Sequence, residues 1–242
     1  MTLENLLITG ATGQQGGAVI SALQAQSHQH FRIFALTRKQ NSPTSLKLSG
    51  QSINLIQGDT SSHRAIFDQL PTLHGVFLVT LPGLHEEDNA SSFIDAALQA
   101  GVKHIVFTSV DRGGPVRSET DEPMLVPHFG VKRDIENHLK TACTEQKEMG
   151  KEVIWTILRP TSFMDNLAPG FVGRVAATAL MQMGGTRVSL VSVKDIGRAA
   201  ATAFEQPRVF GGKALTLTGD LLTFVSRLNV FRSHSSLLVC VR

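Results

Sequence analysis

The sequence predicts an α/β protein built on a doubly wound parallel sheet, with a small, shortened C-terminal domain. Short apolar runs rich in β-branched residues alternate with longer stretches of helical period, which is typical of repeated strand–helix–strand units. The first of these runs leads directly into a glycine-rich turn and then into a helix. The chain has 242 residues, 42% of them hydrophobic, which is enough apolar material to fill a sizeable core.

Seven strands and the helices between them follow from this alternation. Val19, Ile20 and Leu23 form one stripe at helical spacing, so a helix is expected over residues 16–26. A later helix is expected to end just before Gly101, because glycine accepts the left-handed conformation that stops a helix. The strands are expected at residues 6–9, 32–37, 53–56, 76–79, 104–108, 153–158 and 215–217.

Three later segments need separate interpretation. Asp195 is expected to be the N-cap of a helix that carries Ile196 and Ala200, because its carboxylate can accept free backbone N–H groups. Residues 111–127 contain five glycine or proline residues among charged ones, which predicts a mobile loop over a site and no helix. The alternation then stops, and residues 221–242 fit neither a helical nor a strand period.

Composition and charge argue against several classes of protein. The formal net charge is +3, and the 23 basic and 20 acidic residues are scattered, so direct nucleic-acid binding is not expected. Cys143 and Cys240 lie far apart without ligand-like spacing, so neither a disulfide framework nor a metal site is expected. No apolar run approaches the length of about 20 residues that spans a bilayer, so no membrane partner is expected. These features predict a soluble protein of a reducing compartment, the cytoplasm or also the nucleus.

The turn after the first strand has the spacing G-x-x-G-x-x-G. Between a strand and a helix, the first glycine permits a tight turn and the second lets backbone N–H groups approach a pyrophosphate. The third lets the helix pack closely on the sheet, and the alternative interpretation is a tight turn without a ligand. The residues predicted to bind a dinucleotide here are Gly10, Ala11, Thr12, Gly13, Gln14, Gln15 and Gly16.

The end of the second strand favours NADP over NAD. An NAD site places a carboxylate here for the ribose hydroxyl, whereas an NADP site offers a cation to the 2′-phosphate. Arg38 and Lys39 stand at this point, and the alternative is a solvated strand end. Asp59, after the third strand, is predicted to lie at the adenine edge or to form a turn. Thr80, at the end of the fourth strand, is predicted to border the pyrophosphate and ribose.

Further runs make the chain similar to a known family. They are HIVFTS at 104–109, HFGVK at 128–132, LRPTSFMDN at 158–166 and VKDIG at 193–197. Together with the glycine turn, these runs make residues 3–220 resemble the NmrA-like family, an atypical branch of the short-chain dehydrogenase/reductase superfamily. The resemblance implies a Rossmann domain that binds NADP(H) or NAD(P)+, expected over residues 1–158. A small substrate or partner region is expected over residues 159–242, with the strand at 215–217 returning to the main sheet.

The resemblance also implies site residues. Members of the superfamily pair a tyrosine with a lysine four residues later, but this chain contains no tyrosine. His128 and Lys132 stand at the matching spacing, so Lys132 is implied to hold the nicotinamide ribose. His128 or Lys132 is then the candidate proton donor, and packing at the start of a helix is the alternative for His128. The match implies that Phe163, Met164 and Asn166 line the nicotinamide end, with core packing as their alternative.

Two further positions bear on the family pattern. Ser109 stands where the superfamily places its catalytic serine, and the alternative is a simple turn hydroxyl. Residues 219–224 still match the family, whereas residues 225–242 do not.

The family that the chain resembles has two kinds of member, regulators that sense dinucleotide redox state and bind transcription factors, and true reductases. The first expectation is an NADP-binding sensor that signals to a protein partner such as a transcription factor, with binding ordering residues 111–127. The alternative is an NADPH-dependent reductase of a small carbonyl, quinone or enone. A weaker alternative is an interaction module without a ligand.

Overall fold

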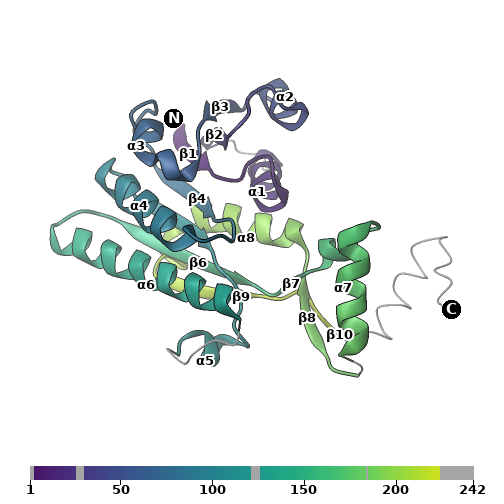
Figure 1. Cartoon of the computed structure of the whole chain (residues 1–242). Helices are drawn as coiled ribbons and strands as arrows, with labels where there is room; N and C mark the ends of the chain where they lie inside the picture. The colour runs from purple at the N-terminus through teal and green to yellow at the C-terminus, as the bar shows by residue number, and fades with distance from the viewer. Residues whose placement is uncertain (1–2, 26–29, 121–125, 184, 224–242) are drawn as a thin grey trace.

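A seven-stranded parallel sheet forms the centre of the computed structural model, which describes residues 3–25, 30–120, 126–183 and 185–223 (Figure 1). Its strands are β1 (Glu4–Ile8), β2 (Phe31–Thr37), β3 (Asn54–Gln57), β4 (Gly75–Val79), β5 (His104–Thr108), β6 (Ile154–Pro160) and β9 (Lys213–Leu217). They lie in the order β3-β2-β1-β4-β5-β6-β9, and every neighbouring pair is parallel. The chain winds outward from β1 in one direction and from β4 in the other, which confirms the predicted doubly wound fold.

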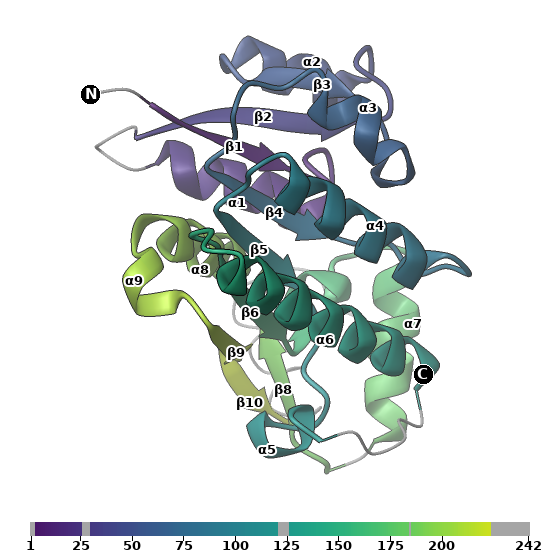
Figure 2. The ribbon, with the colours of Figure 1, turned by 90° about the vertical axis from the view of Figure 1, so that its left-hand side faces the viewer.

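Helices cover both faces of this sheet (Figures 1 and 2). One face carries α1 (Gln14–Gln24) and α8 (Val193–Glu205), and the other carries α3 (His63–Phe67), α4 (Glu86–Gln99) and α6 (Pro127–Glu148). Successive residues of a strand point to opposite faces, so Leu6 and Ile8 of β1 pack under α1 and α8, whereas Leu7 packs under α4 and α6. All three are fully buried, which explains why the strands are continuous apolar runs.

The first helix and the last long helix of the sheet lie unusually close together. A Cβ on Gly197 of α8 would lie 2.5 Å from the backbone of Ala18 in α1, so only glycine allows this approach. Helix α1 follows the glycine turn directly. The contact with α8 therefore fixes the position of the helix that begins at that turn.

The start of α8 corrects one prediction from the sequence. The N-cap is Ser192, whose hydroxyl accepts the Lys194 N–H at 3.1 Å, and not Asp195. Asp195 lies in the first turn and pairs with Arg198 at 2.9 Å. The helix begins earlier than expected because the Ser192 hydroxyl caps it, and its first residue, Val193, is buried.

A smaller sheet follows the carboxyl ends of β6 and β9. Its strands lie in the order β10-β8-β7 and are β7 (Ser162–Phe163), β8 (Val188–Val191) and β10 (Asp220–Leu222). Helix α7 (Phe171–Gln182) stands beside it (Figure 1). The boundary expected at residue 158 falls inside β6, and the strand expected at 215–217 is part of β9, which pairs with β6. Most of the tail expected to lack a pattern, residues 224–242, lies outside the described residues.

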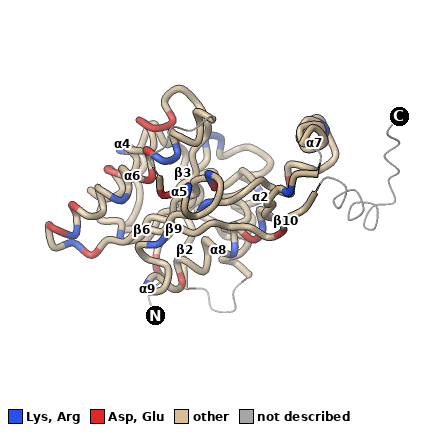
Figure 3. The backbone as a smooth tube through the Cα atoms, turned by 90° about the horizontal axis from the view of Figure 1, so that it is seen from below, with Lys and Arg blue, Asp and Glu red and all other residues tan. Residues whose placement is uncertain are grey.

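Short helices complete the described chain. They are α2 (Pro43–Gly50), η1 (Thr60–Ser62), α5 (Pro115–Ser118), η2 (Met164–Leu167) and α9 (Pro207–Phe210). The positions of basic and acidic residues are interspersed along the backbone (Figure 3). Within the described ranges, no helix is both long enough and apolar enough to cross a bilayer.

Candidate functional site

The candidate site lies where the winding of the main sheet changes direction, between the carboxyl ends of β1 and β4. Open α/β sheets bind ligands at this point, because the connections leave in opposite directions and open a crevice. The buried Thr9 hydroxyl accepts the Val79 N–H at 2.8 Å and so ties the two strand ends together. Gly10 follows one strand end and Thr80 the other. The glycine turn and the polar residues after β4 are therefore neighbours.

The glycine turn has the geometry that its spacing predicts. Gly10 has φ +57°, and a Cβ there would lie 2.4 Å from the Val79 side chain. The Gly13 N–H donates to the Gly10 carbonyl at 2.9 Å and closes the turn. A Cβ on Gly16 would lie 2.3 Å from the same carbonyl, so a side chain at this position would displace the turn.

The first turn of α1 leaves backbone donors for an anion. Its N-cap is Gly13, which provides no side-chain cap, and the first turn carries no acidic residue. Thr12, Gly13 and Gln14 are exposed, whereas Ala11 is buried in the core. Gln15 points elsewhere, since its side chain accepts a hydrogen bond from Thr108 at the end of β5 at 2.7 Å. Free N–H groups and the helix dipole together favour a negative ligand here.

Arg38 and Lys39 extend from the end of β2 into solvent. Among the described residues, no carboxylate pairs with either side chain. The backbone carbonyl of Arg38 accepts a hydrogen bond from Gln57, which steadies the strand end without engaging the guanidinium. Both cations are thus available to an anionic ligand.

Asp59 has a local structural role after the outer strand β3. It is the N-cap of η1, and its carboxylate accepts both the backbone N–H and the hydroxyl of Ser61 at 3.1 Å. This is the turn-forming alternative that the sequence left open, and contact with an adenine edge stays a prediction.

Four polar residues meet beside the turn in what we call the Glu86 cluster: Thr80, Glu86, His128 and Lys132. Glu86 opens α4 and is only 5% exposed. One of its oxygens, Oε1, accepts from the Thr80 hydroxyl at 2.6 Å and pairs with Lys132 Nζ at 3.1 Å. The other, Oε2, lies 3.1 Å from His128 Nδ1. Lys132 Nζ also donates to the Thr80 hydroxyl at 2.5 Å and lies 5.3 Å from the centre of the Phe107 ring.

The opposite charges in the Glu86 cluster stabilise one another. Burial alone would raise the pKa of Glu86, but the Thr80 hydrogen bond, Lys132 and His128 outweigh it and hold that pKa below its ordinary value. Burial lowers the pKa of the Lys132 ammonium, and the carboxylates of Glu86 and Glu136 oppose that effect. The buried Glu86 carboxylate therefore depends on its neighbours to remain ionised.

Other predicted residues lie apart from these hydrogen bonds. Ser109 is buried just after β5. Burial acts to raise the pKa of Glu136, whereas Arg159, Arg112 and the Ser109 hydroxyl lower it. Phe163 and Met164 are half-buried where the chain enters the small sheet, and Asn166 is exposed in η2. Among the described residues, no hydrogen bond joins these three to the Glu86 cluster, and their contact with a nicotinamide stays a prediction.

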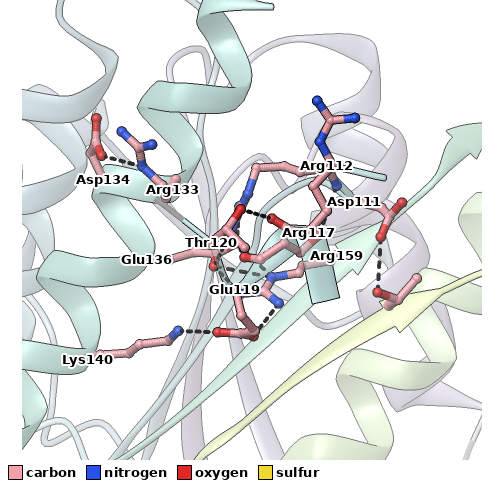
Figure 4. A network of polar contacts seen from close by, with 12 residues as sticks. Asp111, Arg112, Arg117, Glu119, Thr120, Arg133, Asp134, Glu136, Lys140 and Arg159 are labelled. Atoms are coloured by element: carbon pink, nitrogen blue, oxygen red, sulfur yellow. Dashed lines mark hydrogen bonds and ion pairs between the residues drawn. The ribbon is translucent and has the colours of Figure 1, made fainter. Parts of the chain in front are cut away.

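The segment after β5 is anchored by buried ion pairs, which corrects the expectation of a loop without helix (Figure 4). Arg112 Nη1 and Arg159 Nη2 bind the buried Glu136 carboxylate at 2.9 and 2.5 Å. Arg159 Nη1 also pairs with Glu119 at 2.5 Å, and Arg112 donates to the Ser118 carbonyl. The short helix α5 forms between these anchors. Residues 121–125 of the predicted loop lie outside the described residues.

Glu86 and the Arg112–Glu136–Arg159 group were missed in reading the sequence. Glu86 shares the start of α4 with two other acidic residues, Glu87 and Asp88, so nothing in the sequence marks one of them as buried. The available signal was its place six residues after Thr80, at the start of the helix that follows a site strand. The buried arginines had no local signal, because their partner is more than 20 residues away.

Comparison with known proteins identifies the family of the chain. The model of the NmrA-like family matches residues 2–236. The chain belongs to the NmrA-like family. An NmrA-like oxidoreductase of Aspergillus flavus is 31% identical over 58% of the chain and 44% of its own length. A (4-alkanoyl-5-oxo-2,5-dihydrofuran-3-yl)methyl phosphate reductase of Streptomyces griseus is 30% identical over 82% of the chain and 62% of its own length.

The chain thus spans less than two thirds of the length of each of these two relatives. Among solved structures, the Citrobacter triphenylmethane reductase complexed with NADP(H) has a TM-score of 0.72 at 21% identity. That likeness covers 96% of this chain and 76% of the other, and it shows a shared fold.

Proposed function

We propose that this NmrA-like protein is an NADPH-dependent reductase of a small carbonyl, quinone or enone. The observation that carries the proposal is the Glu86 cluster, which holds an imidazole and an ammonium beside the glycine turn at the switch point of the sheet. The relatives named above are oxidoreductases. This favours the reductase over the dinucleotide sensor that the sequence first suggested, since no relative named here is described as a sensor.

The residues present fit a nicotinamide dinucleotide. The glycine turn would clash with any side chain at Gly16, and the uncapped start of α1 offers backbone donors to a pyrophosphate. Arg38 and Lys39 would receive the 2′-phosphate of NADP, which is why we propose NADP and not NAD. The solved Citrobacter neighbour, which is described with NADP(H), has the same fold.

The residues of the Glu86 cluster would bind the nicotinamide ribose and provide the proton. When bound, a reduced dinucleotide supplies the hydride. Two N–H groups of Lys132 are used by Thr80 and Glu86, which leaves the third for a ribose hydroxyl. His128 is 32% exposed in its side chain and turns Nδ1 toward Glu86, so its Nε2 can face a substrate. Either His128 or Lys132 would provide the proton that completes the reduction.

The substrate class rests on chemistry shared with the relatives. The name of the Streptomyces reductase describes a ring alkene conjugated to carbonyl groups, which is an electrophilic acceptor of hydride. The Citrobacter neighbour is named for triphenylmethane dyes, which also contain an electrophilic carbon. We therefore place enones and quinones first among the substrates to be tested.

Binding is tested first by thermal unfolding with NADP+, NADPH, NAD+ and NADH. A ligand at about 100 times its Kd adds about 2.7 kcal/mol to the unfolding free energy, so the NADP forms should raise Tm by several degrees. Arg38→Ala should weaken NADPH binding about 10- to 100-fold, because a charge-assisted hydrogen bond contributes about 1.5–3 kcal/mol. Arg32→Ala, at the exposed opposite end of β2, is the matched control and should bind like the wild type. No protection by any of the four would overturn the proposal.

Turnover is tested by the loss of NADPH absorbance with a panel of quinones, enones and triphenylmethane dyes. Whichever of His128 and Lys132 donates the proton, its replacement by alanine should reduce kcat by at least about 100-fold, the usual contribution of a positioned acid. Binding of NADPH without turnover of any substrate would instead support the sensor.

A further inference from the structure

When a histidine acts as an acid, one ring nitrogen can donate the proton while the other is held by a hydrogen bond. In His128, Nδ1 is the nitrogen that is held. His128 Nδ1 lies 3.1 Å from Glu86 Oε2, and the Glu86 side chain is 2% exposed. We propose that Glu86 and His128 form a carboxylate–imidazole dyad in which Glu86 positions His128 to donate the proton from Nε2, in place of the absent tyrosine. This inference rests on the proposed reductase function and chooses between its two candidate donors.

Hydrogen bonds and ion pairs fix the orientation of the Glu86 carboxylate. Its oxygens have separate partners, Oε1 with Thr80 and Lys132 and Oε2 with His128. The carboxylate therefore cannot rotate without breaking bonds on both sides. A hydrogen bond from Nδ1–H to a carboxylate fixes the tautomer and the orientation of an imidazole and stabilises its protonated form. The ring is thus oriented before a substrate arrives.

Lys132 is less suited to give up a proton. Its side chain is only 6% exposed, and Nζ is held by Thr80 and Glu86. Loss of that proton would leave the buried Glu86 carboxylate without its nearest permanent cation, which is costly at low dielectric. Burial holds the pKa of the Lys132 ammonium below its ordinary value, and the carboxylates of Glu86 and Glu136 act against that effect. Lys132 is therefore a binding and charge-balancing group.

His128 meets the requirements that Lys132 does not. Its side chain is 32% exposed, so water can return the proton after each turnover. Within the described part of the chain, the charged groups beside it are Glu86, which pairs with it directly, and Lys132, which binds the other oxygen of the same carboxylate. In the step itself, hydride adds to the electrophilic carbon, the displaced electron pair moves to the substrate oxygen, and that oxygen takes the proton from Nε2. Glu86 remains ionised throughout.

The test replaces Glu86 by the isosteric glutamine and reads the histidine directly. In the free protein, the ring C–H signals of His128 are followed by NMR against pH and assigned by their loss in His128→Gln. In Glu86→Gln the midpoint of this titration should move to lower pH, because the negative charge 3.1 Å from Nδ1 has been removed. Glu87→Gln, an exposed neighbour in the same turn of α4, should leave the midpoint unchanged.

The pH profile of kcat/KM gives the second reading. Activity should fall as pH rises through the ring titration, because the donor is lost, and in Glu86→Gln this fall should begin at lower pH. NADPH should still raise Tm in the variant. An unchanged midpoint, or an equal loss of activity at every pH, would overturn the dyad even in an active reductase.

A third variant keeps the inference testable if Glu86→Gln does not fold. His128→Gln preserves a hydrogen-bonding group next to Glu86 at a partly exposed position but cannot donate a proton near neutral pH. It should lower kcat at least about 100-fold with little change in the Kd for NADPH. Retained kcat would overturn the role of His128. If the wild type bound NADPH and reduced nothing, the proposed function would fail, and a shifted ring titration would then show a dyad without a role in reduction.

Discussion

At the scale of single residues, two adjacent glycines at the start of α1 have opposite requirements. A Cβ on Gly16 would lie 2.3 Å from the Gly10 carbonyl, whereas a Cβ on Gly17 would meet only the Ala11 carbonyl at 3.6 Å. The first distance is a severe clash with backbone and the second is ordinary contact. The glycine turn is therefore specified by Gly16, and Gly17 is replaceable.

Gly16→Ala should lower the unfolding free energy by about 1–3 kcal/mol, the usual cost of overpacking, and should abolish the rise in Tm caused by NADPH. Gly17→Ala, the matched control, should raise stability by about 0.5–1 kcal/mol, because alanine loses less backbone entropy in a helix. Urea unfolding with and without NADPH measures both effects. A Gly16→Ala variant that is as stable as the wild type and still binds NADPH would contradict the geometry of the turn.

At the scale of elements, α6 joins the Glu86 cluster to the buried ion pairs. His128, Lys132 and Glu136 are spaced by four residues, so they lie along one face of the helix. Its first turn faces Glu86, and one turn beyond Lys132 it binds Arg112 and Arg159. The ion pairs thus set the position of the helix that carries the proposed proton donor.

Glu136→Gln should destabilise the protein by about 3–5 kcal/mol, because it leaves two buried guanidinium groups without their shared carboxylate. Asp134→Asn, on the same helix, is the control: it alters an ion pair with Arg133 whose side chains are 20% and 40% exposed, and should cost no more than about 0.5 kcal/mol. Chemical denaturation compares the two variants. Equal and small effects would mean that the Arg112–Glu136–Arg159 group contributes little to stability.

At the scale of the whole molecule, the stability should decrease on acidification in two stages. Burial, helped by the nearby His74, lowers the pKa of His104 to about 3 from 6.5. The unfolded chain therefore takes up this proton first, and stability should fall as pH drops below 6.5. Below 4.5 the loss should steepen, because the pKa values of Glu86 and Glu136 are held below that ordinary value by their hydrogen bonds and cationic neighbours, against the effect of burial.

His104→Gln should flatten the first stage, since the amide can still hydrogen-bond Thr156, which His104 Nε2 meets at 2.9 Å. One such group changes the unfolding free energy by at most about 1.4 kcal/mol per pH unit. Urea unfolding between pH 7 and pH 5 measures the slope. His85→Gln, with a side chain that is 77% exposed, should keep the slope of the wild type, and an unchanged slope in His104→Gln would assign the acid sensitivity to other groups.

The sequence was sufficient for the main sheet and for the glycine turn, but not for the small sheet or the Glu86 cluster. The strands of a parallel sheet are buried on both faces, so runs such as Leu6–Ile8 stand out without knowledge of their neighbours. By contrast, β7 has two residues and β10 three, which is too short for a period to be visible. The contact of His128 with Glu86 joins positions 42 residues apart, and only the fold brings them together.

The two sheets are interleaved along the chain. The backbone leaves the main sheet after β6, forms β7 and β8, returns to the main sheet as β9, and then adds β10 to the small sheet. No single cut can therefore separate one complete sheet from the other. In evolution, the small sheet could not be exchanged between relatives as one block by a single crossover, and new substrate preferences would have to arise within it by point changes and loop insertions.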